Sequence, residues 1–324
     1  MSEFLKEQLN KAKKTIEAAD HILIAGHASP DGDSLGSMIG LYGAIKENLG
    51  KEAILYSVDP VPASLRFLPM SDVVKNKIGW YPDLIIGVDY GDFHRLSLPK
   101  EMVEGAQIIT FDHHPISKQR GDIKIIETGF SSTAEIIFAF LKTVEWKISK
   151  ETATCLLTGI FTDTGGFSHA TSPDTLEAAA ELMKIGAPIQ QIHSETFASK
   201  TAKVLNVWGK FLSEVEVFPE YGLGAIFVPF DEFEKSGIIL EDFTGLVSML
   251  NLIEETKLSV FAVEYESGKI KGSFRSDKFN DVDVSKMADL LGGGGHKYAA
   301  GFDIEAPSMR EGREKILGAV KRAL

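Results

Sequence analysis

Asp112, His113 and His114 stand side by side shortly after the apolar run 107–110 (QIIT). One aspartate beside one histidine is commonly a structural pair, and either histidine alone could cap the neighbouring backbone. Two imidazoles and a carboxylate directly after a strand instead raise the question of a metal. Mixed imidazole and carboxylate ligands suit Mn, Zn, Fe or Co, whereas an all-oxygen set would favour Mg or Ca.

Acidic and imidazole side chains recur at the ends of other apolar runs. They are His27, Asp31 and Asp33 after residues 21–26, Asp89 with Asp92 after 84–88, and Asp163 at the end of an apolar stretch. Taken singly, most have a common structural role, such as a turn or helix N-cap for Asp31 or Asp33. Carboxylates packed closely repel one another and cannot all stay ionised without cations. The repetition therefore predicts a metal site, and an aspartate shared by two ions would hold them about 3.5–4 Å apart.

The elements that must position these residues alternate between short strands and helices. Strands are expected over 21–26, 52–58, 83–89, 106–112 and 123–128, and helices over 3–18, 35–50, 132–143, 150–160 and 173–185. The strand segments are continuously apolar, as strands covered on both faces should be. We therefore expect an α/β domain over residues 1–185 with a doubly wound, mainly parallel sheet, in which ligands bind beyond the carboxyl ends of the strands.

A helical connector over residues 186–212 leads into a smaller α+β domain at 213–324. Its pattern predicts hairpins within 213–230 and 257–276, the second with ESGK as its turn. Helices are expected at 282–291 and about 308–323.

Four consecutive glycines, 292–295, precede His296 in this second domain. Such a run lets backbone N–H groups converge on an anion, although a flexible linker or a helix C-cap is its commoner use. The small residues 299–301 that follow favour a shaped pocket. Arg275, on the second strand of a hairpin, is either a solvated charge or a group that clamps a phosphate or stacks on a base.

Composition limits the classes of partner. The net charge of −12 provides no broad basic surface for long nucleic acid. Cys155 is the only cysteine, which excludes an intrachain disulfide and favours a reducing compartment. The N-terminal residues predict a polar helix rather than a signal peptide, and no apolar run approaches the ~18 residues of a membrane span. We expect a cytoplasmic protein without a membrane partner.

Five segments resemble one known family. GHASPDGDSLGS (26–37), VDYGD (88–92), DHH (112–114) and GIFTDTGGF (159–167) resemble the successive motifs of the DHH-family phosphoesterases. GGGGHKYAAG (292–301) resembles the signature of the DHH-associated C-terminal domain. The motifs stand in family order over nearly the whole chain. The type resembled is the stand-alone one that includes nanoRNases, pAp phosphatases and cyclic di-AMP phosphodiesterases.

The resemblance implies a set of site residues. The ligands of two ions would be His27 and Asp31 for the first, Asp33, His113 and Asp163 for the second, and Asp89 for both. Asp112 would orient a histidine, and His114 would point at the scissile phosphate as a catalytic residue together with Asp89. Substrate would also contact Arg275, Gly293, Gly294, Gly295 and His296.

The activity implied is that of a manganese-dependent phosphodiesterase, with Mg²⁺ or Co²⁺ as substitutes. It would hydrolyse short or cyclic dinucleotides (cyclic di-AMP, pApA, nanoRNA) to nucleoside monophosphates through a hydroxide activated by two ions. Dephosphorylation of pAp is a second activity of this type, and homodimers are common in it. The metal domain would cut while the small domain holds the far end of the substrate. The alternatives are an inorganic pyrophosphatase, a processive exonuclease and a nucleotide-binding regulator without turnover.

Overall fold

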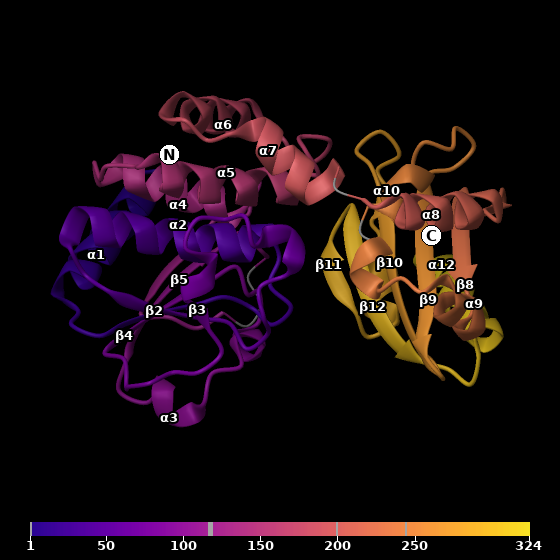
Figure 1. Cartoon of the computed structure of the whole chain (residues 1–324), viewed down its shortest axis with the longest axis horizontal. Helices are drawn as coiled ribbons and strands as arrows, with labels where there is room; N and C mark the ends of the chain where they lie inside the picture. Colours follow the sequence, from indigo (N-terminus) through magenta and orange to yellow (C-terminus); the bar gives the residue numbers. More distant parts are fainter. Residues whose placement is uncertain (1, 116–118, 199, 244) are drawn as a thin grey trace. The chain divides into compact units, whose positions relative to one another are not determined.

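The structure is a computed structural model that describes residues 2–115, 119–198, 200–243 and 245–324. The chain divides into two compact units, residues 1–199 and residues 200–324 (Figure 1). This division falls inside the segment 186–212 expected to connect two domains. Each unit is built on its own six-stranded sheet.

The sheet of the first unit is parallel throughout, with the strand order β3-β2-β1-β4-β5-β6. Its strands are β1 (Ile22–Ala25), β2 (Ala53–Tyr56), β3 (Val74–Lys75), β4 (Leu84–Val88), β5 (Gln107–Asp112) and β6 (Ile123–Ile126). This is the order of a doubly wound α/β fold, which confirms the fold class expected from the apolar runs. The order reverses between β1 and β4, and ligands bind beyond the carboxyl ends of the strands at such a point.

Long helices cover one face of this sheet, and shorter segments cover the other. The helices of the unit are α1 (Glu3–Ala18), α2 (Gly32–Leu49), α3 (Lys100–Val103), α4 (Thr133–Thr143), α5 (Lys150–Asp163), α6 (Pro173–Ile185) and α7 (Ile189–His193). In Figure 1, α1, α2, α4 and α5 lie together along one side of the sheet. The opposite face packs against the short helical turn Phe93–Leu96 and apolar side chains around α3.

Helices α2 and α5 pack closely because glycines remove side chains from their contact. A Cβ placed on Gly36 would lie 2.4 Å from the carbonyl oxygen of Cys155, and one on Gly32 would lie 2.2 Å from the hydroxyl of Thr162. On α5, Gly159 lies against Asp33 of α2 in the same helix contact. This approach brings the start of α2 close to the end of α5.

The second unit has a mixed sheet with the order β11-β12-β10-β9-β8-β7. Its strands are β7 (Glu216–Phe218), β8 (Leu223–Val228), β9 (Leu258–Glu266), β10 (Lys269–Ser276), β11 (Gly294–His296) and β12 (Ala299–Glu305). The antiparallel pairs β7–β8 and β9–β10 confirm the two expected hairpins, while β8 and β9 are parallel.

Helices pack on both faces of this second sheet. They are α8 (Ala202–Ser213), α9 (Phe230–Ser236), α10 (Leu246–Leu250), α11 (Ser285–Leu290) and α12 (Met309–Ala323). Side chains of α11 and α12 share one apolar cluster with the sheet, and side chains of α8 and α10 share another on the opposite face. The smaller α+β fold expected for this part of the chain is thus confirmed.

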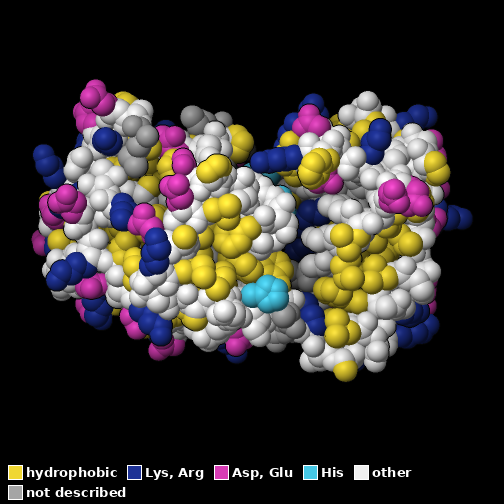
Figure 2. All heavy atoms as spheres, turned by 90° about the horizontal axis from the view of Figure 1, so that it is seen from above, with side chains coloured by type: hydrophobic (Ala, Val, Ile, Leu, Met, Phe, Trp, Pro, Cys, Tyr) yellow, Lys and Arg dark blue, Asp and Glu magenta, His cyan; other side chains and the backbone are white. Residues whose placement is uncertain are grey.

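On the face drawn in Figure 2, apolar side chains gather in patches on each unit, and acidic and basic side chains lie largely outside these patches. Over the described residues, no helix has both the length and the apolar character needed to cross a bilayer.

Candidate active site

The structure brings the six predicted metal ligands together in the first unit. His27, Asp31 and Asp33 follow β1, and Asp89 follows β4. His113 follows the last residue of β5, and Asp163 is the last residue of α5. The carboxyl ends of β1 and β4 flank the reversal of strand order, so the cluster lies where this fold binds ligands.

His27, Asp31 and Asp89 form the first group that could hold a cation. The Nε2 atom of His27 lies 3.6 Å from Asp31 Oδ2 and 3.5 Å from Asp89 Oδ2. Its Nδ1 lies 2.7 Å from the carbonyl oxygen of Ala28, which can only accept a hydrogen bond. Nδ1 therefore carries a proton, and in the neutral ring the Nε2 lone pair faces two carboxylates.

The loop after β1 also fixes Asp31. Its Oδ1 accepts hydrogen bonds from the backbone N–H groups of Asp33 and Ser34 as the N-cap of α2. The capping role considered for Asp31 is therefore real, and it leaves Oδ2 directed at His27. One carboxylate serves both the helix and the candidate cation site.

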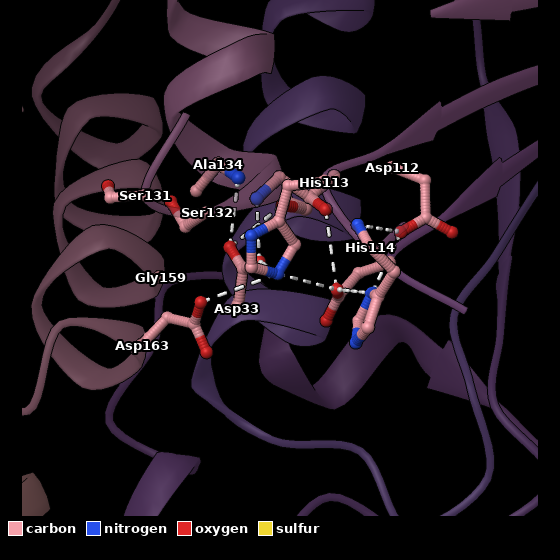
Figure 3. Close-up of polar contacts among 12 residues, drawn as sticks. Asp33, Asp112, His113, His114, Ser131, Ser132, Ala134, Gly159 and Asp163 are labelled. Atoms are coloured by element: carbon pink, nitrogen blue, oxygen red, sulfur yellow. Dashed lines mark hydrogen bonds and ion pairs between the residues drawn. The ribbon is translucent and has the colours of Figure 1, made fainter. Parts of the chain in front are cut away.

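Asp33, His113 and Asp163 form the second group (Figure 3). The Nε2 atom of His113 lies 3.4 Å from Asp163 Oδ2 and 3.9 Å from Asp33 Oδ2. Burial lowers the pKa of His113, which favours the neutral imidazole that metals bind.

Asp89 joins the two groups. Its Oδ2 faces His27, and its Oδ1 lies 3.7 Å from the Nε2 of His113. Asp89 is 2% exposed and has a φ of 53°, in the left-handed region that non-glycine residues seldom adopt. Such a conformation costs about 1–3 kcal/mol and persists only where the surroundings enforce it. Here the backbone N–H of Asp89 donates to the carbonyl oxygen of Phe111 on β5.

The N-terminus of α4 holds Asp33 in place. Asp33 Oδ2 accepts the backbone N–H of Thr133 at 2.7 Å, and Oδ1 accepts that of Ala134 at 2.8 Å (Figure 3). The Thr133 hydroxyl donates to Asp89 Oδ1 at 3.3 Å. Helix N-termini stabilise negative charge. The sequence predicted a helix over 132–143, but it could not assign these backbone donors to Asp33.

The electrostatics of the cluster fit bound cations. Burial, with the negative charges of Asp89 and Asp163, raises the pKa of Asp33 well above its usual range, and burial likewise raises that of Asp163. Burial alone would lower the pKa of His27, but its contacts with Asp31 and Asp89 raise it to about 10. Protons thus compensate the crowded carboxylates of the metal-free protein, and cations can take over that role.

The distances between the candidate ligand atoms also fit bound cations. The separations of 3.4–3.9 Å between histidine nitrogens and carboxylate oxygens exceed a normal hydrogen bond. Two ligand atoms that each lie about 2.0–2.2 Å from one ion are about 3–3.6 Å apart. The side chains present therefore suit divalent cations with mixed nitrogen and oxygen ligands.

Asp112 and His114 form a separate pair beside the cluster. Asp112 is fully buried. Its Oδ1 accepts hydrogen bonds from the backbone N–H of His114 at 3.0 Å and from the ring Nδ1–H of His114 at 2.8 Å (Figure 3). Its Oδ2 accepts the backbone N–H groups of Tyr90 and Gly91 at 3.2 and 2.8 Å. Burial alone would raise the pKa of Asp112, but these hydrogen bonds lower it below its usual value. Asp112 thereby fixes the orientation and tautomer of His114, as expected for an aspartate that orients a histidine.

In the second unit, Arg275 and His296 lie on one face of the sheet. Both are register partners of Ala299, Arg275 from β10 and His296 from β11. Directly opposed residues of antiparallel strands point to the same face. The two side chains therefore flank a small alanine.

Arg275 carries a charge without a counterion in the part of the chain that the structure describes. Its Nη1 donates to the carbonyl oxygen of Phe274 at 2.8 Å, and the side chain is half-buried. Burial lowers its pKa, and no carboxylate opposes that effect. A partly desolvated guanidinium with no acid beside it is suited to binding an anion.

The glycine run differs from the anion-binding loop expected. Gly294 and Gly295 belong to β11 and pair with Gly301 and Ala300. The N–H of Gly293 donates to the carbonyl oxygen of Ala288 near the end of α11, so this N–H is engaged within the chain. A Cβ on Gly293 would lie 2.1 Å from the Gly301 carbonyl oxygen, and one on Gly295 would lie 2.6 Å from that of Ala299. Close backbone approach explains both glycines.

Family models match most of both units. Residues 21–160 match the N-terminal domain of the DHH family, and residues 230–324 match the DHHA1 domain.

Curated relatives and solved structures extend this similarity over the chain. The bifunctional oligoribonuclease and PAP phosphatase NrnA of Thermus thermophilus is 33% identical, covering 98% of this chain and 95% of that protein. NrnA of Bacillus subtilis is 30% identical, covering 90% and 91%. An exopolyphosphatase-related protein from Bacteroides fragilis has a TM-score of 0.90 at 26% identity, covering 98% of this chain and 96% of that one. RecJ of Thermus thermophilus in complex with Mn²⁺ shares the fold, with a TM-score of 0.55 at 15% identity over 99% of this chain and 55% of its own.

The two domains occur in the expected order, and similarity to the relatives covers nearly the full length of both proteins. The chain belongs to the DHH family of phosphoesterases, with an N-terminal DHH domain and a DHHA1 domain, and is a hydrolase of phosphoric ester bonds.

Proposed function

We propose that this protein hydrolyses very short ribonucleotides to nucleoside monophosphates with two manganese ions. The single observation that carries the proposal is Asp89, whose two carboxylate oxygens face the histidines of two separate ligand groups. An aspartate shared in this way is the arrangement of two-metal phosphoester hydrolysis. The names of the relatives, oligoribonuclease and PAP phosphatase, support the substrate class.

The ligand proposal follows the two groups. His27 and Asp31 hold one ion, and Asp33, His113 and Asp163 hold the other, with Asp89 common to both. Ions at these positions lower the pKa of water and stabilise the charge that develops on the phosphoryl oxygens. Nitrogen ligands in both groups favour a transition-metal ion over Mg²⁺ or Ca²⁺, and manganese is the ion that the resemblance to the family implies.

The chain itself orients the phosphate and supplies a hydrogen bond. Asp112 holds the Nδ1–H of His114, which directs the opposite ring edge, with Nε2, away from Asp112. The His114 side chain is 22% exposed, so it is the more accessible histidine of the DHH motif. We assign to His114 a hydrogen bond to the scissile phosphate or to the departing oxygen.

The second unit binds the part of the substrate that is not cleaved. Arg275 binds a terminal phosphate, and His296, on the same face of the sheet, contributes a second hydrogen bond. Gly293, Gly294 and Gly295 keep a substrate-binding role in this proposal, as backbone that a nucleotide can approach closely.

Product analysis tests the activity. The protein is incubated with manganese and equal amounts of linear pApA, cyclic di-AMP, pAp and pyrophosphate, with D89N as the inactive control. AMP released from pApA supports the proposal, and the relative rates decide whether ring opening of cyclic di-AMP and dephosphorylation of pAp belong to this enzyme.

Two other results would overturn the proposal. Release of phosphate from pyrophosphate, with no AMP from any of the nucleotides, would identify an inorganic pyrophosphatase. Tight binding of pApA without hydrolysis would identify a nucleotide-binding regulator.

A further inference from the structure

Phe279 lies on the surface of the second unit with a fully exposed ring. Its exposed fraction is 100%, whereas no other large apolar side chain of the described residues exceeds 80%. It stands in the loop 277–281 (DKFND), between the end of β10 and α11.

This loop is held by its own hydrogen bonds. Asp277 Oδ1 accepts the backbone N–H groups of Phe279 at 2.9 Å and Asn280 at 2.8 Å. The Asp277 carbonyl oxygen accepts the N–H of Asp281 at 2.9 Å. An aspartate that bonds the backbone two residues onward forms a defined turn. The exposure of Phe279 therefore belongs to a structured loop.

A second set of bonds ties the loop to the turn between β11 and β12. Asp281 Oδ1 accepts Lys297 Nζ at 2.6 Å and the Tyr298 hydroxyl at 2.8 Å. The backbone N–H of Ser276 donates to the carbonyl oxygen of Tyr298 at 3.0 Å. His296 immediately precedes this turn, and Arg275 immediately precedes Ser276. Phe279 is therefore fixed at the end of the sheet that carries the proposed phosphate-binding pair.

The neighbours of Phe279 distinguish a nucleotide from a protein as its ligand. Every other residue of the loop is polar or charged, including exposed Lys278. Protein-docking patches are contiguous apolar areas of several hundred Å². Asp277 and Asp281 are engaged in hydrogen bonds of the turn, and the cations close to Phe279 in sequence are Lys278 beside it and Arg275 at the end of β10. A single exposed aromatic ring with cationic side chains close by is the pattern with which proteins bind single-stranded nucleotides.

We propose that Phe279 stacks on a nucleobase of the substrate, next to the phosphate that Arg275 binds. The proposal rests on the proposed function for the identity of that substrate. Stacking on one base, judged from the usual effect of alanine substitution, changes affinity by about 5- to 150-fold.

The test compares F279A, F279W and L252A with the wild-type enzyme. Leu252 is the matched control, because it is an exposed apolar side chain of the same unit, at 80% exposure, outside this loop. The substrates are pApA and its abasic counterpart, in which hydrogen replaces both bases. We expect F279A to raise the KM for pApA by about 5- to 150-fold with little change in kcat. F279W and L252A should keep wild-type values, and all four enzymes should treat the abasic substrate alike.

An unchanged KM of F279A for pApA would overturn the proposal, as would an equal rise for the abasic substrate. A change of oligomeric state in F279A without a change in KM would show that Phe279 contacts protein. If the wild-type enzyme leaves pApA intact, the proposed function is wrong and stacking is tested by binding instead. Wild-type protein should then bind AMP more tightly than ribose 5-phosphate, and F279A should lose that difference. Equal binding of AMP by both proteins would refute stacking.

Discussion

Gly159 on α5 offers a sharp test of how the fold positions Asp33. A Cβ at this residue would lie 2.8 Å from Asp33 Oδ1 and 2.5 Å from the Cβ of Ala134. Ala134 is one of the two residues whose backbone N–H groups hold Asp33. Because a normal contact needs roughly 3.5–4 Å, G159A must displace the start of α4 or the Asp33 carboxylate by about 1 Å.

The effect on metal binding follows from that displacement. Asp33 belongs to the group with His113 and Asp163, so the site of that group should weaken by about 10- to 100-fold, the usual result of disturbing the groups that orient a ligand. The site of His27 and Asp31 should keep its affinity. Isothermal titration with Mn²⁺ measures both sites.

G40A is the matched control for overpacking. Gly40 lies on α2 in the same helix contact, but a Cβ there would meet the flexible end of Leu156, at 2.8 Å, and no residue of the cation site. Overpacking costs about 1–3 kcal/mol in either variant, and each gains up to ~1 kcal/mol of helix propensity. Wild-type affinity in G159A, or an equal loss in G40A, would refute the positioning role of Gly159.

Three further predictions concern His114, Arg275 and His27. D112N should lower kcat by about 10- to 100-fold at unchanged Mn²⁺ affinity, because it removes the carboxylate that holds the Nδ1–H of His114; an unchanged kcat would contradict this. R275A should raise the KM for pApA at least ~10-fold with kcat little changed. Equal losses in kcat and kcat/KM would instead mean that Arg275 contacts the substrate only in the transition state. The pKa of His27 is raised from 6.5 to about 10 in the metal-free protein, so its proton stabilises that state fully below pH 6.5, and the stabilisation disappears as pH rises through 10. Because metals bind neutral imidazole, Mn²⁺ affinity at this site should rise about tenfold per pH unit from pH 6.5 to 8.5, beyond any rise seen in H27N.

The cluster of candidate metal ligands could be predicted from sequence because its residues follow elements that sequence patterns define well. The runs before His27, Asp89 and His113 are continuously apolar and become parallel strands whose carboxyl ends meet at one edge. Once a parallel sheet is inferred, the convergence of the side chains follows from its geometry. The resemblance to the family then divided the side chains into two groups, and the structure shows the same division of distances.

The supporting contacts were harder to predict because they depend on the backbone or on tertiary approach. Thr133 and Ala134 act through N–H groups, which every residue except proline possesses, so residue type carries no signal for them. The glycines at 293 and 295 are required by the pairing of β11 with β12. A run of glycines in a sequence does not predict such a contact. The left-handed backbone of Asp89 likewise results from the contacts around it.

The number of ions bound per chain tests the central claim that Asp89 is shared by two cation sites. Isothermal titration of the metal-free protein with Mn²⁺ should give two sites in the wild type and one in D163N, which keeps the group of His27, Asp31 and Asp89. D89N should weaken both sites, because each Asp89 oxygen faces a different histidine. One ion per wild-type chain, or a D89N protein that keeps one site at full affinity, would contradict the account.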